Sequence, residues 1–474
     1  DYSSIFDLKG SGPAQDAAGF PGGQFSTMFS GNADITIDTK ENTVYAVRSY
    51  AGGLRLKNDG EIIFNGASNI GVSFLTWVPD KSKYIANQFP FYYSGGFRGE
   101  GDVASYVPYV ELNSAKPMKF YGDENVGVFF NKKIGSYDVG IHQGYFKLYF
   151  DIGTQLNSNA AAISQDSRGQ LNKAGYSADK VDNNVGIYAI SGQRTGVNED
   201  SLSTYGFFDL DPIHNLKMDE FNIRFGKYSN NGFMFLAKNG TVIEIENNKT
   251  ALFSDGINGA STSEADASEG TVIAYAEGTW TTSGTGLAEK TSGTIAGKPT
   301  EIIVGKELKM VSKNGIGFFG KDGGLVTVNE KSEGLGYGSI MAYADNGTVN
   351  LNADVKAVDG GVSTVSEKNK NRGAIAVNGG TVNINSNMEI NGVGAFADGT
   401  GSKVTLGNGK TMTVNNDAAL AVSNGGVVNV GNGAVINTAA GTNPSGSEKL
   451  AFYVADANSK INFQGTAANP VTIN

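Results

Sequence analysis

Short stretches of alternating apolar and polar residues recur along the second half of the chain, each after a glycine-containing turn. The alternation has period two, which is typical of a β-strand with one buried face. The turn is usually Asn-Gly or Asp-Gly, a pair that tolerates left-handed backbone and therefore suits a sharp reversal. These stretches lie at 239–245, 322–328, 346–351, 378–384 and 424–430, with looser copies at 398–406 and 456–463.

The stretches keep a nearly constant spacing. One apolar position of each predicted strand serves as an anchor, and the anchors are Val326, Val349, Val382, Val404, Val428 and Ile461. They are separated by 23, 33, 22, 24 and 33 residues, and the two longer intervals contain polar inserts at 361–372 and 438–447. The repeat is therefore about 22 residues long once the inserts are removed.

Each repeat holds three short strands, because apolar segments such as 373–377 precede the turn and others such as 412–414 follow the strand after it. Three strands in about 22 residues predict one rung of a right-handed parallel β-helix, an all-β solenoid with loop insertions. Stacked rungs share a continuous core, and asparagines at equivalent turns can hydrogen-bond along the stack. The alternative is a sandwich or barrel, but such a fold has no reason to keep a 22-residue register.

The first half follows the same pattern more loosely, with Asn-x-Gly or Asn-Gly before alternating apolar residues. The glycines of these motifs are 56, 59 and 46 residues apart, gaps that fit two rungs plus insertions; they are Gly71, Gly127, Gly186 and Gly232. We expect residues 1–229 to form β-helix with long inserts at 78–121, 157–183 and 192–215. We expect residues 230–474 to form regular rungs with a Ser/Thr/Gly-rich loop at 255–299.

Aromatic residues concentrate in the first of these inserts. From 74 to 150, 19 of 77 residues are Phe, Tyr or Trp, against 10% over the whole chain. Two interpretations stay open: a recognition surface, since Tyr, Trp and Arg dominate binding hot spots, or a self-packed insert that covers the solenoid. The candidate binding residues are Trp77, Tyr92, Tyr93, Phe97, Arg98, Tyr106 and Tyr109.

Composition excludes several kinds of site. The chain has no cysteine, which excludes disulfides, thiolate metal ligands and a cysteine nucleophile. His142 and His214 are its two histidines, so a histidine-rich zinc site is not expected. A net charge of −10 argues against nucleic-acid binding, because such binding depends on neutralising phosphates.

Catalytic motifs are also missing. Gly-x-Ser-x-Gly is absent at every serine, so no nucleophile elbow is indicated. Gly409-Lys410-Thr411 lacks the upstream glycine of a phosphate-binding loop. Asp209 and Asp211 lack the spacing and the closing Glu of a calcium loop. We therefore expect no enzymatic activity, no cofactor and no metal site.

The repeat itself resembles a known family. The sequences at 346–352, 378–385 and 424–431, on a rung of about 22 residues, resemble the passenger region of type V autotransporters. The Asn-x-Gly strands of the first half most resemble the very large fusobacterial-type autotransporter adhesins of the outer membrane. This resemblance covers nearly the whole chain and is strongest over 230–474. No signal peptide and no C-terminal barrel are present, so we expect a fragment, and no functional residue of the family can be transferred.

The resemblance implies a passenger domain that is secreted by the type V pathway and displayed on the bacterial cell surface, or released. Its loops would contact a protein or glycan of a host cell or a neighbouring bacterium, in adhesion, coaggregation and virulence. Its anchor in the cell outer membrane would be a C-terminal barrel absent from this chain. Two other classes stay open: a polysaccharide-cleaving β-helix enzyme with carboxylates in a groove, and a secreted passenger toxin.

Overall fold

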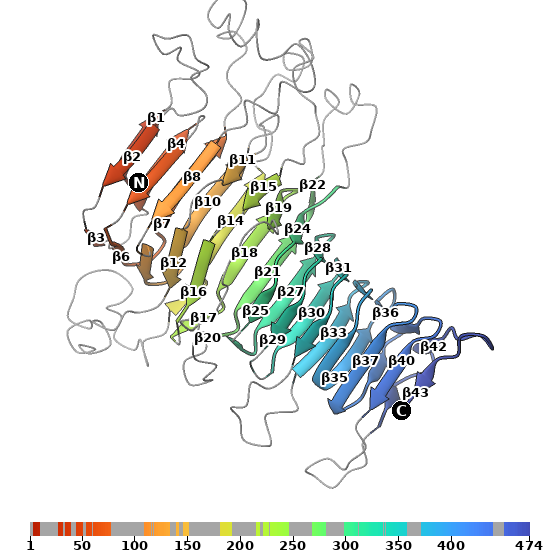
Figure 1. Ribbon diagram of the computed structural model, residues 1–474. Helices are drawn as coiled ribbons and strands as arrows, with labels where there is room; N and C mark the ends of the chain where they lie inside the picture. Colours follow the sequence, from red (N-terminus) through yellow and green to blue (C-terminus); the bar gives the residue numbers. More distant parts are fainter. Residues whose placement is uncertain are drawn as a thin grey trace, which may run out of the picture.

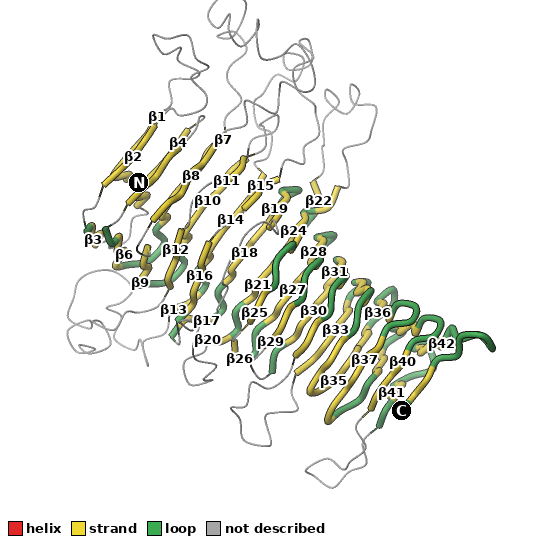
Figure 2. The backbone as a smooth tube through the Cα atoms, in the orientation of Figure 1, coloured by secondary structure: helices red, strands yellow, loops and turns green. Residues whose placement is uncertain are grey.

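The computed structural model is an all-β molecule in which long parallel sheets run along the chain (Figure 1). The structure describes residues 3–474 apart from short gaps and the segments 10–26, 77–108, 151–180, 192–214, 246–267, 281–297, 358–370 and 439–449. Within the described residues there is no helix, and turns and loops join the strands (Figure 2). The all-β prediction is confirmed, and the parallel sheets are consistent with a β-helix or another solenoid.

Sheet A has 19 strands in two rows. Its main row consists of β1 (Ser3–Lys9), β4 (Val44–Tyr50), β7 (Ile70–Thr76), β10 (Val126–Lys132), β14 (Val185–Ser191), β18 (Phe233–Lys238), β21 (Val272–Glu277), β27 (Ile316–Lys321), β30 (Ile340–Asp345), β33 (Asn371–Val377), β35 (Met388–Asp398), β38 (Leu420–Ser423) and β41 (Phe452–Val454). Its side row consists of β25 (Leu308–Met310), β29 (Ser332–Gly334), β32 (Val355–Ala357), the first half of β35, β37 (Thr411–Asn416), β40 (Val435–Thr438) and β43 (Thr472–Ile473).

Sheet B has 13 strands. They are β2 (Thr27–Gly31), β5 (Leu54–Asn58), β8 (Tyr109–Ser114), β11 (Val139–Ile141), β15 (Asn215–Met218), β19 (Val242–Ile245), β24 (Glu301–Val304), β28 (Leu325–Val328), β31 (Thr348–Leu351), β34 (Thr381–Ile384), β36 (Lys403–Leu406), β39 (Val427–Val430) and β42 (Lys460–Phe463).

Three smaller sheets complete the structure. Sheet C occupies the place of the side row in the first half, with β3 (Ile35–Asp38), β6 (Ile62–Asn65), β9 (Met118–Tyr121), β12 (Phe146–Phe150) and β16 (Phe221–Phe225). Sheet D has four two-residue strands, β13 (Val181–Asp182), β17 (Ser229–Asn230), β20 (Ser268–Glu269) and β26 (Ser312–Lys313). The antiparallel pair is β22 (Thr279–Trp280) with β23 (Lys298–Pro299).

The chain visits these sheets in a repeating order. A main-row strand is followed by a sheet B strand and then by a side-row or sheet C strand, as in β27, β28, β29 and the next main-row strand β30. Each strand pairs in parallel with its equivalent in the next repeat, and the anchors are in register: Val326 with Val349, Val349 with Val382, and so on to Ile461. The intervals predicted from the sequence in the second half are therefore confirmed.

In the first half, one turn contains more residues than predicted. β7 pairs directly with β10, and β10 with β14, so each gap of 56 or 59 residues holds one turn and its connections rather than two rungs. The glycine series also ends differently. Val185 lies opposite Phe233, which places Gly186 level with Met234 and not with Gly232. Spacing alone cannot distinguish two rungs from one turn with a long connection.

Three segments expected as inserts contain strands of the sheets. The segment 78–121 includes β8 and β9, the segment 157–183 includes β13, and the expected loop 255–299 includes β20, β21 and the antiparallel pair β22 and β23. Strand β21 pairs with β18 and β27 and contributes to the core. Its sequence at 272–276, Val-Ile-Ala-Tyr-Ala, is a continuous apolar run between stretches rich in Ser, Thr and Gly, so the whole segment resembles a loop.

Inward side chains of all rows form one continuous hydrophobic core. In sheet C the core contains a stack of four fully buried rings, Phe64, Phe120, Phe150 and Phe225. Their centroids are 4.7, 4.9 and 5.1 Å apart, close to the spacing of neighbouring strands. Register and ring stacking therefore support each other, because a shift of one residue would turn every ring outward.

The Asn-x-Gly motif has a packing explanation. At Gly127 an added Cβ would lie 2.5 Å from Cδ1 of Leu148 and 2.8 Å from the carbonyl oxygen of Gly186, so only glycine leaves room for sheet C. The motif's Asn125 is fully buried, and its Oδ1 accepts a 2.8 Å hydrogen bond from the backbone N–H of Asn69 one turn earlier. The motif thus joins successive turns at the corner before β7, β10 and β14.

Candidate functional site

Four long segments leave the sheets at the same corner of the stack. They are 10–26, 77–108, 192–214 and 281–297, and each connects a main-row strand of sheet A to the next strand of sheet B. Because both rows stack in parallel, the strand ends that hold these segments lie along one line. We call this line the insert corner. The other four long segments lie elsewhere: 151–180 and 246–267 precede the sheet D strands β13 and β20, and 358–370 and 439–449 precede the main-row strands β33 and β41.

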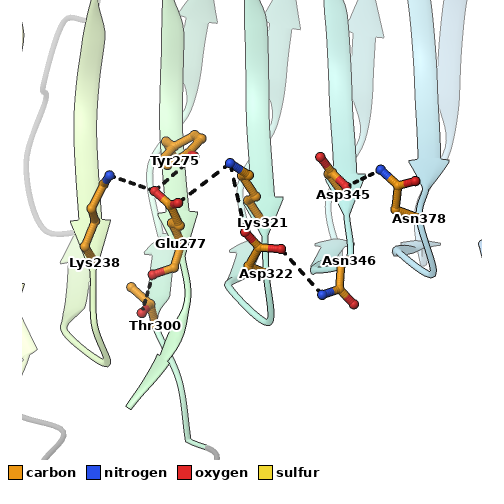
Figure 3. A network of polar contacts seen from close by, with 9 residues as sticks. All are labelled: Lys238, Tyr275, Glu277, Thr300, Lys321, Asp322, Asp345, Asn346 and Asn378. Atoms are coloured by element: carbon orange, nitrogen blue, oxygen red, sulfur yellow. Dashed lines mark hydrogen bonds and ion pairs between the residues drawn. The ribbon is translucent and has the colours of Figure 1, made fainter. Parts of the chain in front are cut away.

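A row of charged side chains ends the main-row strands at the insert corner (Figure 3). Lys238, Glu277, Lys321 and Asp345 lie opposite one another in consecutive strands, so positive and negative charges alternate along the stack. The Glu277 carboxylate lies 2.7 Å from Nζ of Lys238 and 3.7 Å from Nζ of Lys321. It also accepts a 3.1 Å hydrogen bond from the Tyr275 hydroxyl.

The following turns extend this row toward the C-terminus. Asn378 and Asn424 adopt left-handed φ values of 52° and 51°, as predicted for the Asn-Gly turns. Their side-chain amides each donate a 2.7 Å hydrogen bond to a carboxylate one turn earlier, Asp345 and Asp398 respectively. We call the whole set the corner ridge: Lys238, Glu277, Lys321, Asp322, Asp345, Asn346, Asn378, Asp398 and Asn424.

Polar contacts also fix the base of the last insert at this corner. The hydroxyl of buried Thr300, just after segment 281–297, donates a 2.8 Å hydrogen bond to the backbone oxygen of Glu277, just before it. The same hydroxyl oxygen accepts a 2.7 Å bond from the N–H of Gly240. With the β22–β23 pair, these bonds hold both ends of the segment against the stack.

An aromatic row runs beside the charged row. Tyr275, Phe319 and Tyr343 stand two residues before Glu277, Lys321 and Asp345, so they share the outward face of sheet A. Consecutive rings meet edge to face with centroids 4.8 and 4.7 Å apart.

Burial and charge shift the pKa values of this region. Burial, followed by the Glu277 carboxylate, raises the pKa of the Tyr275 hydroxyl well above its usual range. Burial would also raise the pKa of Glu277, but Lys238, the Tyr275 hydroxyl and Lys321 together outweigh it and hold this pKa below its usual range. Both groups therefore keep their ordinary charge at neutral pH, and the contacts are those of an ionised carboxylate.

Of the candidate binding residues predicted from the sequence, the structure describes only Tyr109. Tyr109 is the first residue of β8, which puts it where segment 77–108 rejoins sheet B. The others lie outside the described residues, as do His142 and His214, and they stay predictions: Trp77, Tyr92, Tyr93, Phe97, Arg98 and Tyr106. The prediction from the sequence does not include the corner ridge. The sequence does contain a pattern that indicates it, because Lys238, Lys321 and Asp345 each directly precede an Asn-Gly or Asp-Gly turn.

Comparison with known proteins identifies no relative. No protein-family model, no curated protein and no solved structure matches the chain. Among the residues placed by the structure, no group of three or more His, Asp or Glu side chains is arranged to hold a metal ion. The same residues include no helix long and apolar enough to cross a membrane. A functional proposal therefore depends on the architecture of the chain itself.

Proposed function

We propose that the chain is a right-handed parallel β-helix of about 22 residues per rung that acts as the passenger region of a bacterial autotransporter adhesin. The parallel sheets, the repeating strand order and the in-register anchors support the β-helix. Right-handedness follows from a general rule, because connections between parallel strands of one sheet are right-handed in about 98% of cases.

The observation that carries the adhesive role is the line of four long inserts at one corner. A β-helix gives each insert a rigid base, and binding residues are often found on loops that a rigid scaffold positions. The hydrogen bonds of Thr300 and the contacts of the corner ridge supply that base around segment 281–297. Several inserts on one line suit extended or multivalent contact with a protein or glycan on another cell.

The corner ridge favours binding over catalysis. A glycosidase needs one carboxylic acid with a raised pKa beside an ionised one. Glu277 instead has a lowered pKa, and Asp345 and Asp398 accept hydrogen bonds from asparagine amides. Polysaccharide cleavage and membrane damage by a passenger toxin are the alternative functions, and the experiment below tests them as well.

The test is binding of the purified chain to host cells, partner bacteria and a glycan panel. A variant with 77–108 replaced by a short Gly/Ser linker is expected to lose binding, and so is Tyr92→Ala/Tyr93→Ala/Phe97→Ala. The matched control replaces 358–370, an insert that precedes a main-row strand, and is expected to bind normally. Thermal midpoints of all variants are expected to equal that of the unaltered chain.

Three outcomes would contradict the proposal. Absence of binding by the intact chain would remove the adhesive role from this segment of sequence. Equal loss of binding in both linker variants would remove the role of the insert corner. Release of reducing ends from polysaccharides, or dye leakage from liposomes, without cell binding would favour the enzyme or the toxin respectively.

A further inference from the structure

The corner ridge contains three asparagines that are each followed directly by glycine: Asn346, Asn378 and Asn424. Asparagine is among the thermolabile residues of proteins. The backbone nitrogen of the next residue can attack the asparagine carboxamide, and glycine has no side chain to obstruct that attack. In a folded chain the reaction depends on how firmly the carboxamide and the glycine N–H are held.

Hydrogen bonds hold both reacting groups at Asn378. Its side-chain amide donates to Asp345 at 2.7 Å, and the N–H of Gly379 donates to Oγ of Ser402 at 3.0 Å. Ring closure at this turn would therefore have to break both bonds. The equivalent turn further along the ridge repeats them at 2.7 and 3.0 Å, with Asn424, Asp398, Gly425 and Ser459.

The corresponding groups at Asn346 are held less firmly. Its Nδ2 lies 3.5 Å from Oδ1 of Asp322, longer than the usual range for an N–H···O hydrogen bond (Figure 3). Among the hydrogen bonds between described residues, none has the N–H of Gly347 as its donor. Because Asn346 is exposed, its carboxamide has room to turn toward that nitrogen.

The burial of Gly347 favours ring closure at this turn. A buried N–H without an acceptor costs free energy, and the nitrogen of the closed ring carries no hydrogen. At Gly379 the same reaction would instead sacrifice the bond to Ser402. The two turns therefore differ in the same direction at the attacking nitrogen and at the carboxamide.

The register of the stack explains why one hydroxyl is missing. Ser402, which accepts the Gly379 N–H, is the residue just before β36, the next strand of sheet B. After Asn346 the next strand of sheet B is β34, and the residue just before it is Gly380. An added Cβ there would lie 2.2 Å from the carbonyl oxygen of Ala344, so close packing opposes a serine at this position.

We propose that Asn346 is a site of spontaneous deamidation in the folded chain, whereas Asn378 and Asn424 are protected. The nitrogen of Gly347 attacks Cγ of Asn346, and the bond from Cγ to Nδ2 breaks. The proton of the Gly347 N–H passes through solvent to the departing nitrogen, which leaves as ammonia. Water then opens the resulting succinimide at either carbonyl and gives aspartate or isoaspartate. The reaction needs no oxidant and no partner, and it is independent of the adhesive role.

Deamidation changes the contacts of the corner ridge. The new carboxylate of residue 346 would face the carboxylate of Asp322, toward which the Asn346 amide now points. Like charges opposite each other on neighbouring strands are destabilising. The isoaspartate product also lengthens the main chain in the turn between β30 and β31. The modification therefore replaces a weak attraction between turns with a repulsion.

Peptide mapping by mass spectrometry tests the proposal. The purified chain is kept in warm, mildly alkaline buffer, and deamidation at the three asparagines is followed over time. Asn346 is expected to react roughly tenfold faster than Asn378 and Asn424, because ring closure there breaks no short hydrogen bond. In concentrated urea, which removes the folded contacts, the three sites are expected to react at similar rates.

A matched pair of variants tests the protecting hydroxyls. Ser402→Ala removes the acceptor of the Gly379 N–H and is expected to raise the rate at Asn378 severalfold. The rate at Asn424 is expected to stay unchanged in the same sample, which shows that the rest of the ridge is intact. Ser459→Ala is the reciprocal variant, expected to raise the rate at Asn424 alone. Should one of the two not fold, the other makes the same comparison.

Three results would overturn the proposal. The first is equal or faster deamidation at Asn378 or Asn424 in the folded chain. The second is deamidation of Asn346 in urea but not in the folded chain, because the turn would then protect it. The third is an unchanged rate at the asparagine whose hydroxyl partner was removed, because the hydroxyl would then not be the cause of the protection.

Discussion

Single asparagines connect one turn of the chain to the next in two ways. On the outside, the Asn385 amide donates to Asn352 at 2.9 Å, and the Asn352 amide donates to Asn329 at 2.9 Å, so the side chains form a ladder. In the interior, Asn125 accepts the Asn69 N–H and donates to a backbone oxygen. Replacing an asparagine of the exposed ladder is therefore expected to change the free energy of unfolding little, whereas replacing a buried asparagine is expected to lower it clearly.

Asn125→Ala is expected to lower the free energy of unfolding by about 1–3 kcal/mol, because it removes the acceptor of a buried N–H and the donor to the Gly66 oxygen. Urea denaturation measures the change. Asn385→Ala is the matched control on the exposed ladder, where the change is expected to stay within about 0.5 kcal/mol. Equal effects of the two substitutions would show that the buried hydrogen bonds of Asn125 stabilise the chain no more than the exposed bond of Asn385.

Glu277→Gln is expected to destabilise the chain at neutral pH by about 1 kcal/mol, allowing for solvent screening of its contacts with Lys238 and Lys321. The pKa of Glu277 is lowered in the folded chain, so its contribution is present above the ordinary value of 4.5 and is lost as pH falls through the folded value. The difference between the two proteins should therefore shrink in acid. Urea midpoints measured at neutral and acid pH test this, and a constant difference would contradict it.

At the scale of elements, each row holds its register by stacking like side chains on like. The four phenylalanine rings of sheet C lie on consecutive strands β6, β9, β12 and β16. The aromatic row on the outward face of sheet A is less buried, and its rings meet edge to face. Stability is then close to a sum of contacts between neighbouring turns, so damage to one strand stays local.

Phe150→Ala is expected to cost about 3–5 kcal/mol, because Phe150 is fully buried between Phe120 and Phe225. Hydrogen exchange should show lost protection in β9, β12 and β16 and unchanged protection in β36, β39 and β42. Phe396→Ala, a partly exposed ring of the outward row, serves as the control and should cost less. Loss of protection along the whole chain would mean that the turns unfold as one unit.

At the scale of the whole molecule, the 13 strands of sheet B at about 4.8 Å each give a stack roughly 60 Å long. The insert corner presents segments that vary in length from turn to turn, which suits recognition of another cell. The binding experiment above tests this surface.

The sequence by itself determined the repeating local structure. Period-two alternation after Asn-Gly turns predicted the strands, and the 22-residue spacing placed Val326 opposite Val349 and Val404 opposite Val428, as the structure confirms. It could do so because each strand pairs in parallel with its equivalent in the next repeat, so contacts recur at one interval along the chain. In the first half the interval is broken by connections of different length, and there the same reasoning counted too many rungs.

Only the tertiary structure decided which distant residues share a surface. Lys238, Glu277 and Lys321 are about 40 residues apart in sequence, yet stacking in parallel at strand spacing brings their charges together. The same stacking brings the strand ends that flank four long inserts to one corner. The physical reason is that the residues paired between turns depend on the number of residues in each connection. The local pattern of apolar and polar positions does not encode that number.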